Sequence, residues 1–291
     1  MRAMTPDDIY RIHWIGETDI SPDGGRVAFV VTKLDRESDG YKSAVWVVDT
    51  AGGEPRQFTA GAKRDSSPRW SPDGTMLAFV SERGENKPQL AVMPAAGGES
   101  RLLTKLPLGA GVPAWSPDGT QIAFSAKTGT PPDPDPKKAK PYRTITTMKY
   151  RVNGQGFTYD QRRHLFVLDV ATREARQVTD GDWDDTQPAW SPDGQTLAFV
   201  SARHDEREFD SASDIWVVPA AGGEARQVTP TLGARGAPSW SPDGRYIVFS
   251  SDRRNGNDLY IAEARTGFEE EEAVLLTEDQ LEDDSFPIWQ V

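Results

Sequence analysis

The phrase Ser-Pro-Asp-Gly recurs along the chain, and this repetition constrains the fold more than any other feature of the sequence. Five copies occur in 291 residues, and they start at Ser21, Ser71, Ser116, Ser191 and Ser241. A tryptophan precedes each of the last four copies, and a threonine lies 11 residues before each of these tryptophans. The four tryptophans are Trp70, Trp115, Trp190 and Trp240. A fixed phrase at such spacing indicates one supersecondary unit repeated along the chain.

Each repeat contains the signals of four short strands. An apolar strand follows the turn phrase, as at residues 77–80, and a second follows a polar loop, as at residues 90–93. A Gly-Gly-Glu turn and a short strand ending at the threonine complete most units. Five units are complete, and residues 287–289 start a sixth. Four-stranded antiparallel units repeated in this way predict an all-β chain folded as a β-propeller.

The turn phrase and its tryptophan both have structural explanations. Proline fixes φ at the second turn position, the serine and aspartate side chains bond nearby backbone groups, and glycine accepts a positive φ. The tryptophan is a large apolar plate, so we expect it to pack between neighbouring sheets rather than to bind a ligand. We assign the same structural role to the aspartates and glycines of these four turns, namely Asp73, Gly74, Asp118, Gly119, Asp193, Gly194, Asp243 and Gly244.

Composition excludes several classes of function. The chain has 33 Lys and Arg against 45 Asp and Glu, a net charge of −12, which argues against nucleic acid as a partner. Zero cysteines exclude disulfides and cysteine-based metal sites, and the three histidines lack the spacing of zinc ligands. We therefore expect neither a metal nor another cofactor.

The N-terminal region predicts a short arm ahead of the propeller. Thr5 before Pro6 is typical of a helix N-cap followed by a first-turn proline, which predicts a short helix to about Arg11. We assign residues 1–17 to this arm and residues 18–291 to the propeller domain. The sequence has no signal peptide or run of 18 apolar residues, so we expect a cytoplasmic protein without a membrane partner.

The third repeat is longer than the others because it carries a basic insertion, at about residues 130–163. Consecutive Pro-Asp pairs open the insertion, and residues 137–163 then contain eight basic side chains and one acid. Aromatic residues are interleaved with these cations, which favours packing over free solvation. Two interpretations stay open: a solvated loop, or a segment that docks on an acidic surface or pairs with a peptide carboxylate.

Several segments together resemble a known family. Residues 4–10 (Met-Thr-Pro-Asp-Asp-Ile-Tyr), the Trp-Ser-Pro-Asp-Gly repeats, and residues 150–157 (Tyr-Arg-Val-Asn-Gly-Gln-Gly-Phe) with 162–167 (Arg-Arg-His-Leu-Phe-Val) carry the resemblance. They are similar to the N-terminal propeller of the prolyl oligopeptidase family of serine peptidases, in its acylaminoacyl-peptidase branch. The resemblance implies a seven-bladed ring and a C-terminal α/β-hydrolase domain with a Gly-x-Ser-x-Gly nucleophile turn. That motif does not occur in these 291 residues, so we expect no catalytic residue and no peptidase activity in this chain alone.

The function implied by this resemblance is control of access. We expect the propeller to admit short peptides to a hydrolase domain outside this chain, of which the chain would be a fragment. Another copy of the chain is a second expected partner, since it could cover the open blade faces. The candidate substrate-binding or gating residues are Tyr150, Arg151, Phe157, Arg162 and Arg163. The alternatives are a stand-alone TolB-like protein-binding propeller without enzymatic activity, and a five-bladed glycosidase, which would need two carboxylates facing one pocket.

Overall fold

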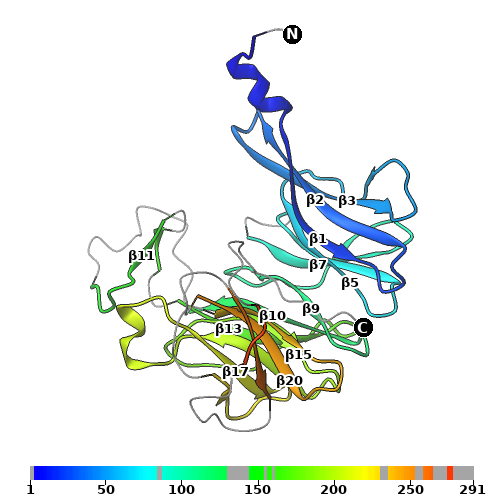
Figure 1. The fold of residues 1–291 in the computed structure, drawn as a ribbon. Coiled ribbons are helices and arrows are strands. Elements are labelled where there is room, and N and C mark those ends of the chain that lie inside the picture. The colour runs from blue at the N-terminus through cyan, green and yellow to red at the C-terminus, as the bar shows by residue number, and fades with distance from the viewer. Residues whose placement is uncertain are drawn as a thin grey trace. The chain divides into compact units, whose positions relative to one another are not determined.

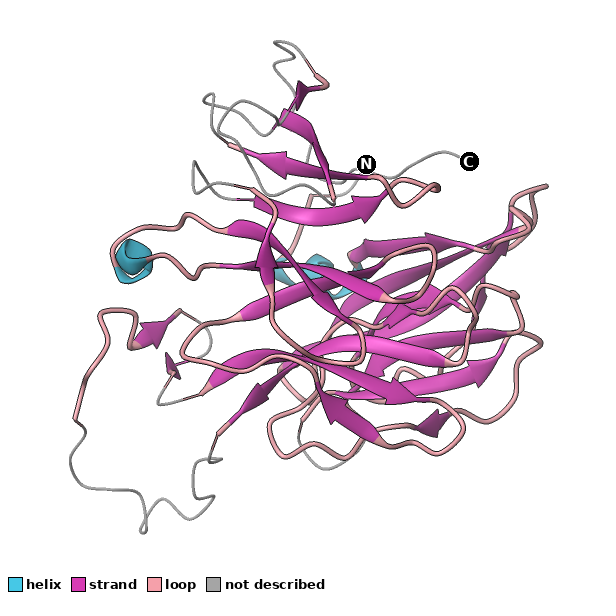
Figure 2. Ribbon diagram, turned by 90° about the horizontal axis from the view of Figure 1, so that it is seen from below, coloured by secondary structure: helices cyan, strands magenta, loops and turns pink. Residues whose placement is uncertain are grey.

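The computed structural model describes residues 3–83, 87–129, 144–153, 156–158, 161–229, 235–252, 258–264 and 274–277. The first part of the basic insertion (residues 130–143), its residues 154–155 and 159–160, and the start of the sixth repeat (residues 287–289) lie outside these ranges. The described elements are almost all strands, and the helices are two short segments, η1 (Pro6–Arg11) and η2 (Asp205–Glu208) (Figures 1 and 2). In the described parts of the chain, no helix has the length and apolar character needed to cross a bilayer.

The described strands form five four-stranded sheets, one for each complete repeat of the sequence. Four of the sheets use strands that are consecutive in the chain, and their neighbouring strands pair antiparallel. The first sheet contains β1 (His13–Ile20), β2 (Arg26–Asp35), β3 (Gly40–Asp49) and β4 (Arg56–Gln57). The second contains β5 (Asp65–Trp70), β6 (Met76–Ser81), β7 (Gln89–Pro94) and β8 (Arg101–Leu102). The fourth contains β15 (Asp185–Trp190), β16 (Thr196–Ser201), β17 (Asp214–Pro219) and β18 (Arg226–Gln227), and the fifth contains β19 (Arg235–Trp240), β20 (Tyr246–Ser251), β21 (Asp258–Glu263) and β22 (Val274–Leu275).

The third sheet differs because the basic insertion interrupts it. Its strands are β9 (Ala114–Trp115), β10 (Gln121–Thr128), β13 (Arg162–Asp169) and β14 (Ala175–Gln177), in the order β14-β13-β10-β9. Between β10 and β13 the insertion forms a separate antiparallel hairpin of β11 (Arg151–Val152) and β12 (Gly156–Phe157). The sequence-based all-β class and the four-stranded organisation are thus confirmed.

Contacts group the chain into two compact units. The first comprises Met1–Ile122 with Leu168–Ala175, and the second comprises Ala123–Val167 with Arg176–Val291. Sheets one and two lie in the first unit, and sheets four and five lie in the second. The insertion hairpin and the site described below belong to the second unit.

The turn phrase forms the same hydrogen-bonded structure in all five copies. In the third copy, Ser116 Oγ donates to Asp118 Oδ1 at 2.6 Å, and Gly119 N donates to Ser116 O at 2.9 Å. Gly119 has a φ of +71°, a conformation that strains any side-chain-bearing residue. The Ser116 hydroxyl is the main cause that lowers the pKa of the Asp118 carboxyl. These bonds are local, which explains why the sequence alone predicts the turn.

Trp70, Trp115 and Trp240 each contact the preceding sheet of the same unit. Trp70 and Trp190 are 5% and 9% exposed. Trp115 Nε1 donates to Arg69 O of β5 at 3.0 Å, and Trp240 Nε1 donates to Ala189 O of β15 at 3.1 Å. Each of these two indoles therefore bonds the first strand of the preceding sheet. The second strands contribute the fully buried core phenylalanines Phe79, Phe124, Phe199 and Phe249.

The N-terminal arm is shorter than its sequence-based boundary. The expected short helix is confirmed as η1, a 3₁₀ helix with Thr5 at its N-cap. Thr5 N and Thr5 Oγ1 both donate to Asp8 Oδ2, at 2.8 and 3.2 Å, so a capping interaction fixes this end. β1 already begins at His13, inside the segment 1–17, because these residues pair with the long strand β2 as far as Lys33.

Candidate functional site

The hairpin of the basic insertion carries an aromatic pair. The rings of Tyr150 and Phe157 have centroids 6.1 Å apart, and the guanidinium of Arg151 lies over the Phe157 ring at 5.7 Å. Arg151 and Phe157 are direct partners across β11 and β12, which explains why the cation reaches the ring. Tyr150 remains 42% exposed. Three of the five candidate gating residues therefore lie together on one small, accessible element.

Lys149 fixes this hairpin to the segment around η2 (Figure 1). Its backbone N–H donates to Glu208 Oε2 at 3.2 Å, and its Nζ donates to the backbone oxygens of Arg207 and Asp210. The end of the segment is itself braced, since His204 Nε2 lies 2.9 Å from Asp210 Oδ1. The hydrogen bond with His204 is the main cause that lowers the pKa of the Asp210 carboxyl. Within its described part, the insertion is thus docked rather than freely solvated.

The end of the insertion meets an acidic loop, residues 180–185 (Asp-Gly-Asp-Trp-Asp-Asp). Arg162 Nη2 lies 2.8 Å from Asp182 Oδ1, and the backbone N–H of Arg163 donates to Asp184 Oδ1 at 2.6 Å. Arg207 also approaches Asp182, at 3.6 Å. This loop is not among the predicted site residues, although four aspartates in six residues are a visible signal in the sequence.

A buried cluster of ionisable side chains lies at the end of the acidic loop, around Asp185. His164 Nδ1 lies 3.4 Å from Asp185 Oδ2, and Arg203 Nη2 lies 2.9 Å from Asp185 Oδ1. The side chains of His164 and Asp185 are 5% and 0% exposed, so neither is open to bulk water. Arg203 supplies the charge that offsets the buried carboxylate, as a buried carboxylate requires.

Aromatic rings surround the guanidinium of Arg203. It lies 4.8 Å from the ring centroids of both Trp183 and Trp216, and 5.2 Å from that of Phe199. Gly181 leaves the space that Trp183 occupies, because a Cβ there would meet the indole at 2.4 Å, and its φ of +115° also favours glycine. Cation–π contacts and the ion pair with Asp185 thus hold one arginine in a single position.

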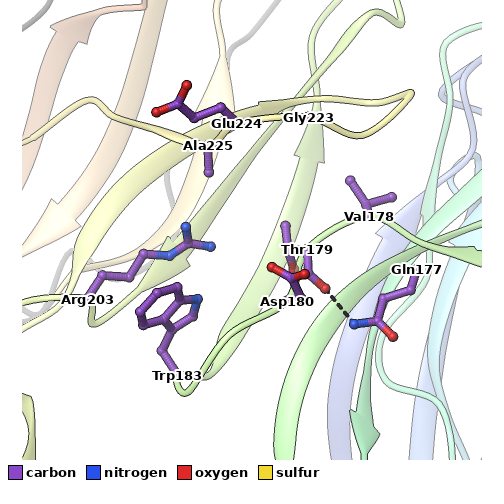
Figure 3. Close-up of a pocket in the computed structure, with 9 residues that line it drawn as sticks. All are labelled: Gln177, Val178, Thr179, Asp180, Trp183, Arg203, Gly223, Glu224 and Ala225. Carbon is purple, nitrogen blue, oxygen red and sulfur yellow. Dashed lines mark hydrogen bonds between the residues drawn. The ribbon is translucent and has the colours of Figure 1, made fainter.

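A cavity of about 570 Å³ opens beside this arginine (Figure 3). In Figure 3 the guanidinium of Arg203 lies alongside Trp183 and points toward Ala225 and Thr179, while the Glu224 carboxylate points away. One wall is closed by the hydrogen bond from Gln177 Nε2 to Thr179 O, 2.8 Å long. The lining residues are Gln177, Val178, Thr179, Asp180, Trp183, Arg203, Gly223, Glu224 and Ala225.

The five candidate gating residues do not line this cavity. Tyr150, Arg151 and Phe157 lie on the hairpin, and Arg162 and Arg163 begin β13 beside the acidic loop. Sequence reasoning missed Trp183 and Arg203, because nothing local marks them as partners. Among the described residues, no group of three or more His, Cys, Asp or Glu is arranged to hold a metal ion.

Comparison with curated proteins finds relatives of two kinds. The chain is 32% identical over 203 residues to the uncharacterized peptidase YuxL of Bacillus subtilis, which covers 68% of this chain and 31% of that protein. It is 29% identical over 180 residues to a TolB homolog of Chlorobium chlorochromatii, which covers 62% of this chain and 32% of that protein. The chain therefore spans about a third of the length of the curated relatives it matches.

Solved structures agree on the fold. A puromycin-hydrolyzing peptidase of Mycobacterium tuberculosis matches with a TM-score of 0.68 at 16% identity, over 95% of this chain and 41% of that one. The acylaminoacyl peptidase of Pyrococcus horikoshii matches with a TM-score of 0.66 at 16% identity, over 87% of this chain and 39% of that one. The resemblance to the propellers of such peptidases is confirmed at the level of the fold.

A family model identifies the repeats directly. The model of the TolB beta propeller domain (PD40) matches residues 15–133 and 157–277, which leaves out residues 1–14, 134–156 and 278–291. The two matched stretches contain all five turn phrases and, apart from the first two residues of β1, all five four-stranded sheets. The chain belongs to the TolB beta propeller domain family.

Proposed function

We propose that this chain is the propeller domain of a longer serine peptidase and that it controls which peptides reach a hydrolase domain. The observation that carries the proposal is the 32% identity to a curated peptidase of which the chain spans 31%. The aligned stretch makes up about a third of that protein, which leaves the chemistry to the remainder. The structural matches to two peptidases support the same assignment through the fold.

The insertion hairpin is the element we assign to gating. Tyr150 and Phe157 present aromatic surface that suits the side chains of a passing peptide, and Arg151 presents a cation that suits its carboxylate. Arg162 and Arg163 act at the base of the insertion, where their contacts with the acidic loop fix its direction. Because the insertion is anchored at both ends, its hairpin can discriminate between short and long peptides while it stays folded.

A second candidate is a TolB-like propeller that binds protein partners and has no enzymatic role. The observation that favours it is the family model itself, together with the 29% identity to a TolB homolog. In either case a second copy of the chain remains an expected partner.

Peptide length selectivity tests the proposal. The full-length natural protein should hydrolyse short chromogenic peptides, and kcat/KM should fall steeply with peptide length. Tyr150→Ala and Phe157→Ala should change the ratio of kcat/KM for long and short peptides. Tyr41→Ala is the matched control, because Tyr41 is also an exposed aromatic residue, at 51%, but lies on β3, outside the hairpin and its anchor. A full-length protein without peptide hydrolysis would favour the TolB-like alternative.

A further inference from the structure

Two arginines hold equivalent places in the second and fourth sheets. Each arginine lies two residues after the serine that ends the second strand of its sheet. Arg83 Nε donates to Ser81 Oγ at 2.8 Å, and Arg203 Nε donates to Ser201 Oγ at 3.1 Å. Each also pairs through Nη2 with the aspartate that begins the first strand, Arg83 with Asp65 at 3.1 Å and Arg203 with Asp185 at 2.9 Å. The repeat therefore builds the same Asp-Ser-Arg unit twice, and differences between the two copies are informative.

The copies differ at the remaining nitrogen, Nη1. Arg83 Nη1 donates to Ser100 Oγ, on the residue that follows the Gly-Gly-Glu turn. The corresponding residue after the turn in the fourth repeat is Ala225, which has no acceptor in its side chain. Among the described residues, none accepts a hydrogen bond from Arg203 Nη1. The Ser-to-Ala difference thus leaves one guanidinium N–H group without a protein partner.

That donor belongs to the lining of the cavity. Arg203 and Ala225 both line the space of about 570 Å³, and the Arg203 side chain is only 11% exposed. In the second repeat, the positions that correspond to Trp183 and Asp184 of the acidic loop are occupied by a lysine and an arginine, residues 63 and 64. The tryptophan that stacks on the guanidinium is therefore also specific to the fourth repeat.

We propose that this cavity binds the carboxylate of an amino acid or short peptide through Arg203 Nη1. Arg203 lines the cavity and its Nη1 has no acceptor among the described residues, so a carboxylate that enters can form a charge-assisted hydrogen bond with it. The Asp180 carboxylate lines the same cavity and is suited to the ammonium group of such a ligand. The lining has one cation, Arg203, and two acids, Asp180 and Glu224, which disfavours a phosphate dianion. The volume is in the usual range for small-molecule sites.

Titration calorimetry on the full 291-residue chain tests the proposal with the dipeptide Gly-Phe as probe. Gly-Phe should bind at one site per chain. The C-terminal amide of the dipeptide should bind about tenfold more weakly or worse, and so should inorganic phosphate. The N-acetylated dipeptide should also bind more weakly, because it lacks the ammonium group that would donate a hydrogen bond to the Asp180 carboxylate. Equal affinity for the acid and the amide would overturn the proposal, as would phosphate binding as tightly as the dipeptide.

Ala225→Ser is the decisive variant, because it installs the hydroxyl that satisfies Arg83 in the second repeat. The added Oγ should occupy Arg203 Nη1 and weaken Gly-Phe binding by about tenfold. Ser100→Ala is the matched control, since it exchanges the same two residues in the other copy and should leave the affinity unchanged. Wild-type affinity in Ala225→Ser, with an unchanged urea midpoint, would overturn the proposal.

A third variant keeps the test decisive if Ala225→Ser fails to fold. Asp180→Asn should weaken binding of Gly-Phe and leave binding of the N-acetylated dipeptide unchanged; an equal loss for both would count against the site. None of these measurements requires a hydrolase domain, so a negative result here would leave the proposed function standing.

Discussion

Arg162 Nη2 and Asp182 Oδ1 lie 2.8 Å apart, and this ion pair joins the strand that follows the basic insertion to the acidic loop. The Arg162 side chain is 16% exposed and that of Asp182 is 66% exposed, so the pair lies at the protein surface. Exposed pairs of this kind contribute about 0.2–1 kcal/mol to stability. The contact therefore sets the direction of the insertion more than it stabilises the fold.

Loss of Lys149 should release the insertion hairpin. Lys149→Ala removes the donor that reaches the backbone oxygens of Arg207 and Asp210. Because local opening exposes the backbone to proteases, chymotrypsin should cleave after Tyr150 and Phe157 severalfold faster than in the parent protein. Lys105→Ala, a change at an exposed lysine of the second sheet's edge, serves as the control. Identical cleavage rates for Lys149→Ala and the parent would contradict the anchoring role.

Gly181→Ala should destabilise the fourth sheet more than a comparable change elsewhere. Gly181 and Gly97 both have positive φ, +115° and +95°, so alanine strains the backbone at either position. A Cβ at Gly97 meets nothing within 4 Å, whereas one at Gly181 meets the Trp183 indole at 2.4 Å. The additional overpacking should cost about 1–3 kcal/mol. Urea midpoints and tryptophan fluorescence measure the difference, and equal midpoints for the two variants would refute it.

Trp240→Phe should lower stability through one hydrogen bond. The substitution keeps an aromatic ring but removes the Nε1 donor to Ala189 O, leaving that carbonyl to find another partner. The loss should be about 1–2 kcal/mol in the free energy of unfolding. Trp14→Phe is the control, because Trp14 is 40% exposed and its Nε1 has no acceptor among the described residues. A larger effect at Trp14 than at Trp240 would speak against a bridging role for the repeat tryptophan.

The pKa of Asp35 should depend more on Ser38 than on Lys42. Its carboxylate accepts bonds from Ser38 Oγ at 2.6 Å and Ser38 N at 3.0 Å, and Lys42 Nζ lies 3.0 Å away. The Ser38 hydroxyl first, then Lys42, lower the pKa of Asp35 from its ordinary value of 3.8 to about 2. Carboxyl-carbon NMR titration should therefore show a larger rise in the pKa for Ser38→Ala than for Lys42→Met. The opposite order would show that charge, rather than hydrogen bonding, dominates.

The same shift has a consequence for stability. A carboxyl whose pKa is lower in the folded than in the unfolded state stabilises the fold above the unfolded value. The contribution of Asp35 is therefore complete above about pH 4 and is lost as the pH falls from 3.8 toward 2. Asp35→Asn should flatten this part of the stability profile.

The sequence predicts the repeating fold well because the repeat is built from local interactions. Ser116, Asp118 and Gly119 close their turn within a few residues, so the phrase itself specifies the structure. The acidic loop and its partners could not be predicted in the same way. Lys149 and Asp210 are 61 residues apart, and only the folded chain brings them together.

The cavity illustrates a different limit. The difference between Ser100 and Ala225 is visible when the two Gly-Gly-Glu turns are aligned. Its meaning depends on the contact between Ser100 and Arg83, which are 17 residues apart in the sequence; Ser100 directly precedes β8, and Arg83 follows the end of β6. Repeats that differ at one residue therefore become informative only once a structure shows what that residue bonds.

The most direct test of the central claim is the intact mass of the natural protein together with its labelling by a serine-reactive fluorophosphonate. An antibody against this chain should isolate from its cells a polypeptide a little more than twice the 32.1 kDa of these 291 residues, and the probe should label it. An unlabelled polypeptide of 32.1 kDa would contradict the assignment to a peptidase and favour a stand-alone propeller.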